Sequence, residues 1–239
     1  MEQVALRYFQ EVQKAMQQIQ TQELNSIIEA GVKIGHTIAN GGIFHVFGSG
    51  HSDLVATDCF LRAGGLACAN KITDLTRGHA ERIENYGKSL VERYDLQAGE
   101  VIVIISNSGR NAAPIDVAIH ARERGLTVVA ITSLEHSKSV TSRHSSGKKL
   151  FNVADIVIDN HVKLGDACIE IRPGSPRTGA VSTVLGATIL NMILVQATSV
   201  CIGLKGEAPL IVSQNLDNMD ERNRELWLRY KQRLGPIEI

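Results

Sequence analysis

The sequence predicts an α/β protein in which helices cover both faces of a parallel β-sheet. Strand-like runs alternate along the chain with segments of helical spacing, and this alternation is typical of parallel sheets. The clearest strand is Val101–Ile105, five consecutive apolar residues that are mostly β-branched, as expected for a central strand buried on both faces. In such sheets, ligands bind beyond the carboxyl ends of the strands.

Two amphipathic helices are expected within residues 3–40, because apolar residues recur there at spacings of three and four. Asn40-Gly41-Gly42 ends the second helix, as glycine-rich segments do. The pair has no basic recognition face, so we expect it to serve packing or dimerisation rather than DNA recognition. A short apolar strand, Ile43–Phe47, follows and runs into the Gly48–Asp53 turn and a short helix.

Strands are also expected at Leu66–Ile72, Leu126–Ile131 and Ala154–Ile158, and helices at residues 78–93, Pro114–Arg124, 180–202 and Asp217–Arg233. Pro114 fits the first turn of its helix, where the missing N–H is not needed. Residues 159–177 are expected to be irregular, because the segment contains glycine and proline.

Bulk composition excludes several classes of function. The 239 residues are 44% hydrophobic, enough for one substantial core, and 25 basic residues balance 25 acidic ones. No basic excess points to nucleic acid or to an anionic membrane. The start is amphipathic and has no signal-peptide core. Polar residues such as Asn191 and Gln196 interrupt the apolar segment 180–204, which favours a buried helix over a membrane span.

The four cysteines are scattered, which argues against a disulfide framework or a zinc site and for reduced thiols inside the cell. The spacing of His, Cys and Asp predicts no other metal site. We therefore expect a cytoplasmic protein without a bound metal.

A hydroxyl- and glycine-rich turn follows the central strand directly and leads into a helix. Ser106, Asn107, Ser108 and Gly109 present side-chain oxygens and backbone N–H groups at the amino end of that helix, where anions bind. Two other strands also end in hydroxyls, the first at Ser49 and Ser52 and another at Thr132 and Ser133. Because three successive strands end this way, we expect a shared pocket that binds phosphate.

The order strand–GSGHS–helix, strand–SNSGRN–helix and strand–ITS resembles the sugar isomerase (SIS) domain over about residues 25–205. The chain is most similar to SIS-domain proteins without an assigned reaction, and more distantly to phosphoheptose isomerases and N-acetylmuramic acid 6-phosphate etherases. The resemblance implies a three-layer α/β/α sandwich of the flavodoxin-like type, with a five-stranded parallel sheet, and a dimer or higher homo-oligomer. We expect a single SIS domain over 1–239, with N-terminal helices in 1–40, the core in 41–205 and a C-terminal tail and helix in 206–239.

The resemblance also implies which residues bind the substrate. The Ser-x-Ser-Gly turn matches the family's phosphate-binding turn, the glycine-rich turn before it faces the sugar, and the third strand end completes the pocket. The residues carried over in this way are Gly48, Ser49, Gly50, Ser52, Ser106, Asn107, Ser108, Gly109, Asn111, Thr132 and Ser133.

The catalytic residues of these enzyme groups lack clear counterparts in this chain. Where both enzyme groups place a catalytic Glu, this chain has Arg62, and residues 178–202 contain no counterpart of the isomerases' His. The predicted catalytic residues are therefore Glu84, with Glu81 three residues away as an alternative, and His51. Each has a plainer interpretation: the acids as solvated helix residues and His51 as a helix-entry residue.

Two further interpretations concern the loops of the pocket. Gly48-x-Gly50 could begin a dinucleotide fingerprint, but Asp53 stands where the third glycine belongs, beside a pyrophosphate. We therefore expect no nucleotide or redox cofactor. The polar segment 135–149 contains His136 and His144 and begins at the pocket wall, so it could form a lid that brings Arg143 or Lys148 to a phosphate.

Three functions fit these residues. The favoured one is a sugar-phosphate (aldose–ketose) isomerase that moves a proton between neighbouring carbons through an enediol. An etherase-like lyase would begin with the same proton abstraction. A non-catalytic sugar-phosphate sensor would need only the phosphate turn.

Overall fold

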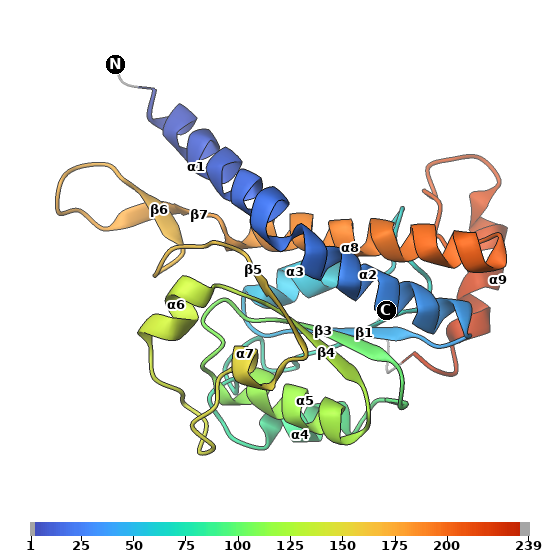
Figure 1. The fold of residues 1–239 in the computed structure, drawn as a ribbon. Coiled ribbons are helices and arrows are strands. Elements are labelled where there is room, and N and C mark those ends of the chain that lie inside the picture. The colour runs from blue at the N-terminus through green and yellow to red at the C-terminus, as the bar shows by residue number, and fades with distance from the viewer. Residues whose placement is uncertain (1–2, 235–239) are drawn as a thin grey trace.

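The computed structural model describes residues 3–234 and contains a five-stranded parallel sheet (Figure 1). The strand order is β2-β1-β3-β4-β5, and every neighbouring pair is parallel. The chain order reverses between β1 and β3, which makes their carboxyl ends the switch point where ligands bind in such folds. The strands are β1 (Phe44–Gly48), β2 (Ala69–Ile72), β3 (Val101–Ile105), β4 (Thr127–Thr132) and β5 (Ile156–Asp159).

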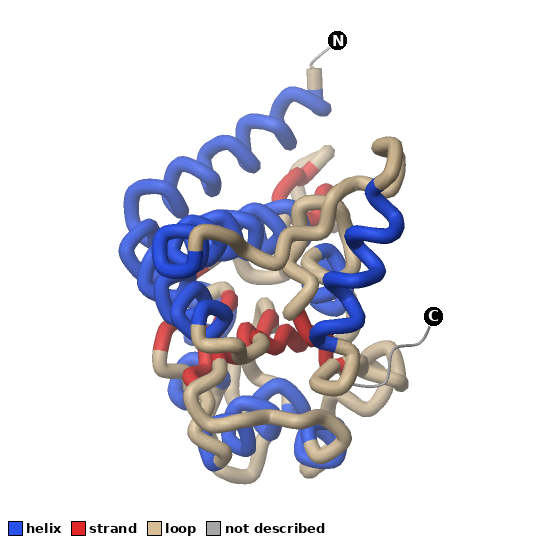
Figure 2. The backbone as a smooth tube through the Cα atoms, turned by 90° about the vertical axis from the view of Figure 1, so that its right-hand side faces the viewer, coloured by secondary structure: helices blue, strands red, loops and turns tan. Residues whose placement is uncertain are grey.

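Helices cover both faces of the sheet, and Figure 2 shows the strands between two helical layers. Val101, Val103 and Ile105 pack on one face, in the core of α2 and α8. Ile102 and Ile104 pack on the other face, against α4 and α5. The strand is thus buried on both sides, as its unbroken apolar run predicts. The first layer holds α1 (Val4–Gln18), α2 (Leu24–Ala39), α3 (Ser52–Asp58) and α8 (Ser182–Lys205); the second holds α4 (Tyr86–Val91), α5 (Ala112–Glu123) and α7 (Leu150–Val153).

The N-terminal helices form one nearly continuous rod. A π-helical turn, η1 (Ile19–Glu23), joins α1 to α2 where the sequence predicts two separate helices. The first part, α1, projects from the body together with the two-stranded hairpin β6 (Ala167–Glu170) and β7 (Arg177–Ala180) (Figure 1). The Tyr8 ring packs on Gly179, where a Cβ would lie 2.8 Å from the ring, and its hydroxyl donates to the Ala180 carbonyl.

Three segments differ from what the sequence predicts. The hairpin lies in the segment predicted to be irregular, because a pairing of two short four-residue strands leaves almost no periodic signal. The helix expected over 78–93 exists only as α4, and residues 73–85 form successive turns instead. Asn85, with a left-handed φ of 65°, marks the start of α4. A short helix, α6 (Leu134–Ser139), also occupies part of the predicted polar loop.

The apolar helix α8 is long and apolar enough to cross a membrane, but it packs as a core helix does. Leu185, Ile189 and Ile193 on it are fully buried, and it lies along α2 in the first layer. The last helix of the described residues is α9 (Met219–Tyr230), which lies within the predicted range Asp217–Arg233. All four cysteines are free.

Candidate functional site

The turn after β3 is held by its carbonyl groups. Thr132 Oγ1 donates to the carbonyl of Ser106 at 2.7 Å, and the Ser133 N–H donates to that of Asn107 at 3.0 Å. Ser137 Oγ donates to the carbonyl of Ser108 at 2.8 Å. The Leu150 N–H binds the carbonyl of Gly109 at 2.9 Å. Four successive carbonyls are therefore fixed to β4, α6 and α7.

This arrangement turns the N–H groups of the turn outward. In a trans peptide the N–H points opposite to the carbonyl of the same unit, so the amides of residues 107–110 point away from the scaffold. Within the described residues, neither these N–H groups nor the hydroxyls of Ser106 and Ser108 have a hydrogen-bond partner. Such outward N–H groups beside a helix start form a concave anion-binding surface. Gly109 permits the turn, because its φ is 56° and a Cβ would lie 3.0 Å from Ser137 Oγ.

Asn111 leaves the start of α5 uncapped. It occupies the N-cap position, where an Asn side chain normally bonds the first turn of the helix, but its side chain makes no such bond. The amide Nδ2 instead donates to Glu81 Oε1 at 2.8 Å, and Oδ1 accepts from Arg143 Nη1 at 2.8 Å. The Asn111 side chain therefore leaves the first turn of α5 without its usual cap, although the Ala113 N–H there donates to the Glu81 carbonyl, and Asn111 joins two charged residues beside the helix start.

The turn after β1 is compact. A Cβ on Gly48 would lie 2.4 Å from the Ser52 carbonyl oxygen, so only glycine fits there. Gly50 has a left-handed φ of 59°, and Gly78 approaches it so closely that a Cβ on Gly78 would lie 3.0 Å from Gly50 Cα. The turn after β1 and the segment after β2 are therefore in direct backbone contact.

Asp74 fastens these two segments together. Its carboxylate accepts from Ser49 Oγ at 2.6 Å, from the Gly78 N–H at 2.8 Å and from the Tyr86 hydroxyl at 2.7 Å. Burial raises the pKa of Asp74, but the hydrogen bonds from Ser49, Tyr86 and Thr76 outweigh it and lower the pKa. Asp74 is therefore a charged anchor for the site.

Glu81 lies between the two turns. Its carboxylate is half-buried and bonds Asn111, and its backbone carbonyl accepts from the Ala113 N–H at 3.0 Å. Burial raises the pKa of Glu81, and Arg82, Arg143 and a hydrogen bond from Ser49 oppose the shift. A carboxylate with a raised pKa, beside an anion-binding turn, has the properties of a general base.

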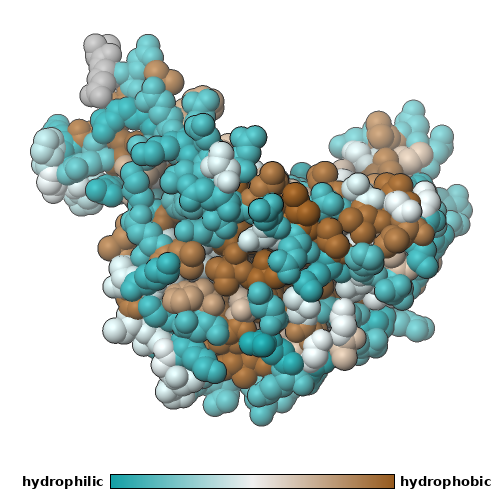
Figure 3. All heavy atoms as spheres, in the orientation of Figure 1, coloured by the Kyte–Doolittle hydropathy of each residue, from teal (hydrophilic) through white to brown (hydrophobic). Residues whose placement is uncertain are grey.

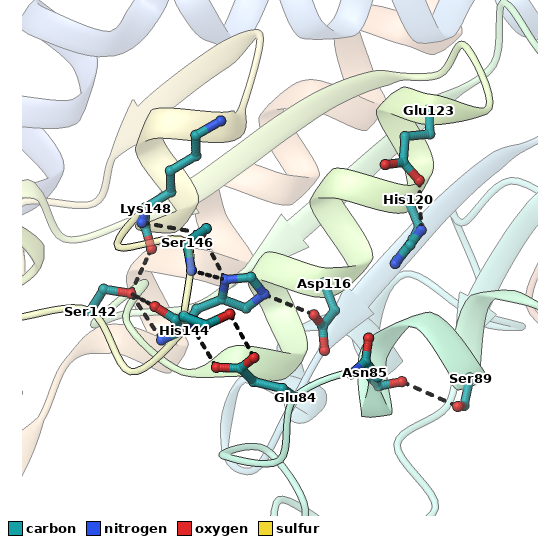
Figure 4. A network of polar contacts seen from close by, with 11 residues as sticks. Glu84, Asn85, Ser89, Asp116, His120, Glu123, Ser142, His144, Ser146 and Lys148 are labelled. Carbon is teal, nitrogen blue, oxygen red and sulfur yellow. Dashed lines mark hydrogen bonds and ion pairs between the residues drawn. The ribbon is translucent and has the colours of Figure 1, made fainter.

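Glu84, by contrast, binds the segment that contains Arg143. Its carboxylate is exposed and accepts from the Ser145 N–H at 2.6 Å and from Ser145 Oγ at 2.7 Å. These bonds lower the pKa of Glu84. Beside it, His144 Nε2 bonds Asp116 Oδ1 at 3.1 Å and Nδ1 bonds Ser146 Oγ at 2.7 Å, as Figure 4 shows.

Other residues that the sequence singled out lie in three kinds of position. Thr132 and Ser133 are buried, and their hydroxyls already bond the Ser106 and Val162 carbonyls, so they support the turn from behind. His51 is exposed, at the first residue before α3, and Arg62 pairs with Asp58 on the surface. The Asn107 side chain is held in place by Asn160, whose Nδ2 donates to Asn107 Oδ1 at 3.0 Å.

Sequence reasoning missed Asp74 and the Glu81–Asn111–Arg143 contacts. The predicted helix over 78–93 put Glu81 and Glu84 on one face, whereas the turns at 73–85 separate them. The signal available was Thr73-Asp74-Leu75-Thr76, an acid flanked by hydroxyls directly after β2. Among the described residues, no group of three His, Cys, Asp or Glu side chains could hold a metal ion.

The SIS domain family model matches residues 7–133. A UPF0309 protein of Thermoanaerobacter pseudethanolicus is 41% identical over 96% of this chain and 98% of its own length. A UPF0309 protein of Halalkalibacterium halodurans is 38% identical over 97% of this chain and 96% of its own.

Two solved structures share the fold. The phosphoheptose isomerase of Francisella tularensis superposes with a TM-score of 0.54 at 15% identity, over 85% of this chain and 97% of its own. The phosphoheptose isomerase GmhA of Neisseria gonorrhoeae superposes with a TM-score of 0.52 at 19% identity, over 84% and 97%. The family match over more than half of the chain, together with these full-length relatives, establishes that the protein belongs to the SIS domain family.

Proposed function

We propose that this protein binds a sugar phosphate and moves a proton on the sugar carbons next to a carbonyl group. The observation that carries the proposal is the turn at 106–111. Its carbonyls are tied to the scaffold, while its N–H groups and the hydroxyls of Ser106 and Ser108 are left for a ligand. These neutral donors, together with the positive end of α5, suit a phosphate dianion.

The proton is removed by Glu81. Its carboxylate takes the proton from the carbon next to the carbonyl, the electrons of that C–H bond form a carbon–carbon double bond, and the carbonyl oxygen becomes the negatively charged oxygen of an enediolate. A proton passes from the adjacent hydroxyl to that oxygen, and the protonated Glu81 returns its proton to the neighbouring carbon, which completes an aldose–ketose isomerisation without a redox cofactor. Glu81 is favoured over Glu84 because its carboxylate faces the two ligand-binding turns, whereas the Glu84 carboxylate is bound to Ser145. His51 is exposed beside the first turn and could contact a sugar oxygen.

An elimination is the second candidate reaction. It begins with the same proton abstraction and ends with loss of a leaving group from the next carbon. The sequence of α8 contains no counterpart of the isomerases' His, and this observation favours a reaction served by one carboxylate. Both reactions need the phosphate turn and Glu81.

We also propose that two copies of the chain associate through α2 and α8. Apolar side chains gather over these helices in Figure 3. Between the helices lies a groove of about 650 Å³, whose lining includes Leu24, Ile28 and Val195, and these three side chains are exposed. Leu6 and Phe9 on the projecting α1 are exposed as well. Apolar surface of this kind is typical of protein interfaces, and the projecting arm offers a second copy further contacts.

Solvent exchange tests the proposed chemistry. The protein is incubated in deuterated water with hexose, amino-sugar and heptose phosphates, and the sugar protons are followed by nuclear magnetic resonance. One sugar phosphate is expected to exchange the proton on the carbon next to its carbonyl. If a ligand binds the phosphate turn and exchanges no proton, the protein is a sensor and the proposed catalysis is wrong.

A further inference from the structure

The 140–149 loop, residues Val140 to Lys149, is fastened to three separate parts of the site. The Arg143 N–H donates to the Arg110 carbonyl at 2.8 Å, directly after the phosphate turn. His144 bonds Asp116 on α5, and Ser145 bonds Glu84 before α4 (Figure 4). These three contacts hold the loop in one position beside the phosphate turn.

The anchors fix one side chain at the site, that of Arg143. Its Nη1 donates to Asn111 Oδ1 at 2.8 Å, and the amide of Asn111 donates in turn to Glu81. Asn111 therefore links the Arg143 guanidinium to the carboxylate of Glu81, the proposed base. Only one of its N–H donors has a hydrogen bond to a side chain in the described part of the chain, so the others are available to a ligand.

Positive charge at this point is not matched by ion pairs. Arg82, Arg110 and Arg143 form no salt bridge with any carboxylate among residues 3–234. The Nε atom of Arg110 is buried and has no hydrogen-bond partner in the same range. Burial and the charges of Arg110 and Arg82 lower the pKa of Arg143, while the charge of Glu81 partly opposes the shift, so the positive charge of the three guanidinium groups is offset only in part. An anionic group of a ligand would relieve this repulsion.

We propose that Arg143 recognises a second negative charge on the ligand, at the sugar carbons that face Glu81. This inference rests on the proposed function and specifies its ligand: a phosphate at one end and a negatively charged oxygen at the other. That oxygen belongs either to a carboxylate of an acidic sugar or to the enediolate formed when Glu81 removes a proton. Arg143 is thus a specificity-determining residue of the site.

Three matched probes test this inference by calorimetric titration: sorbitol 6-phosphate, glucose 6-phosphate and 6-phosphogluconate, with inorganic phosphate as reference. Only 6-phosphogluconate has a carboxylate at the end opposite the phosphate. We expect it to bind the wild-type protein about tenfold more tightly than sorbitol 6-phosphate, which is the usual effect of a charge-assisted hydrogen bond. Arg143→Gln should reduce this preference to about twofold and leave binding of inorganic phosphate unchanged.

Lys148→Gln is the control, because it removes a positive charge from the same loop while the Lys148 side chain points away from the bonded cluster in Figure 4. This variant should keep the preference for 6-phosphogluconate.

Equal binding of the three probes to the wild type, or an unchanged preference in Arg143→Gln, overturns the inference and leaves the proposed phosphate turn unaffected. If inorganic phosphate and all three probes fail to bind, the proposed function fails as well. If the wild type prefers 6-phosphogluconate and Arg143→Gln does not, Arg143 is the residue that recognises the second negative charge. Isotope exchange by the Arg143→Gln variant then shows whether that charge belongs to the enediolate or to the carboxylate of an acidic sugar. Exchange that falls at least about tenfold with a neutral sugar phosphate indicates the enediolate, and unchanged exchange indicates an acidic sugar.

Discussion

The Asn111 side-chain amide donates a hydrogen bond of 2.8 Å to the Glu81 carboxylate, and this bond joins the phosphate turn to the proposed base. Asn111 begins the helix whose amino end would hold the phosphate. Glu81 comes from the segment after β2 that Asp74 fastens to the first turn. A ligand bound by the turn would therefore lie beside one carboxylate whose position and orientation are already set.

Replacing Glu81 by Gln should abolish proton exchange and leave phosphate binding unchanged. Gln keeps the size and the hydrogen bond to Asn111 but cannot accept the substrate proton. The Glu84→Gln variant is the matched control and should keep most of the exchange, because its carboxylate binds Ser145. Exchange is measured by nuclear magnetic resonance in deuterated water. Loss of exchange in Glu84→Gln but not in Glu81→Gln would reverse the assignment.

The exchange rate should also rise with pH through a pKa above the ordinary value for Glu. The base must be ionised to accept a proton, and burial raises the pKa of Glu81. The acidic limb of the pH–rate profile therefore moves to higher pH. A limb at or below 4.5, the ordinary value for Glu, contradicts Glu81 as the base.

The network at the opposite end of the sheet predicts how stability depends on acid. Burial alone would raise the pKa of Glu100, but hydrogen bonds from His45 and from the Ile43 and Gln97 N–H groups lower it from 4.5 to about 2. A carboxyl group with a depressed pKa in the folded state stabilises the fold above its unfolded pKa. The Glu100 side chain is only 4% exposed, so solvent screens these interactions little. The lowered pKa corresponds to about 3 kcal/mol of the free energy of unfolding, which should be lost as the pH falls from 4.5 towards 2.

Urea unfolding at pH 7 and pH 3 checks this dependence. Glu100→Gln should lower the free energy of unfolding at pH 7 and lose that part of the acid dependence. Glu92→Gln, at an exposed residue 4.0 Å from Lys88, should change neither. An unchanged acid dependence in Glu100→Gln would contradict the role given to this network.

Gly78→Ala should damage the site through the backbone. The residue has a φ of 91°, and a Cβ would meet Gly50 Cα at 3.0 Å, so neither segment can yield without moving the first turn. We expect a loss of about 1–3 kcal/mol in the free energy of unfolding and weaker sugar binding. Gly147→Ala is the control, since its φ of 69° is also left-handed but no atom lies within 4 Å of its Cβ. Equal losses in both variants would assign the effect to the φ angle alone.

Val195→Glu should convert the proposed dimer to a monomer. The side chain is 71% exposed in one chain, so a charge there is tolerated unless a second copy covers it. Leu228→Glu, at an exposed position on α9, should leave the assembly unchanged. Light scattering on a sizing column measures the mass. A wild-type monomer at micromolar concentration contradicts association.

The fold followed from the sequence because its strongest signals are local. The apolar run Val101–Ile105 became β3 with the predicted bounds, and the SIS resemblance gave the five-stranded sheet. Residues 78–85 were misinterpreted because Ile83 has helical spacing with Tyr86 and Leu90 of α4. The hydrogen bonds of Asp74 instead hold a series of turns there. The hairpin formed by β6 and β7 is stabilised by contact with α1, which no local pattern records.

The site was predictable in its residue types and less so in their roles. Thr132 and Ser133 lie at the end of a strand as Ser106 and Ser108 do, but β4 lies beside β3, so the Thr132 hydroxyl and the Ser133 N–H bond the backbone of the turn. Whether Glu81 or Glu84 faces the turns depends on long-range bonds to Asn111 and Ser145. The spacing of the two acids carries no information about either bond.

The central claim is that the turn at 106–111 binds phosphate, and thermal unfolding with phosphate ligands tests it most directly. A ligand at about 100 times its dissociation constant adds roughly 2.7 kcal/mol to the free energy of unfolding. We predict that a sugar phosphate raises the unfolding temperature of the wild type, that the free sugar does not, and that Ser108→Ala removes the shift while exposed Ser139→Ala keeps it. A shift that persists in Ser108→Ala, or that the free sugar reproduces, would contradict a phosphate site at this turn.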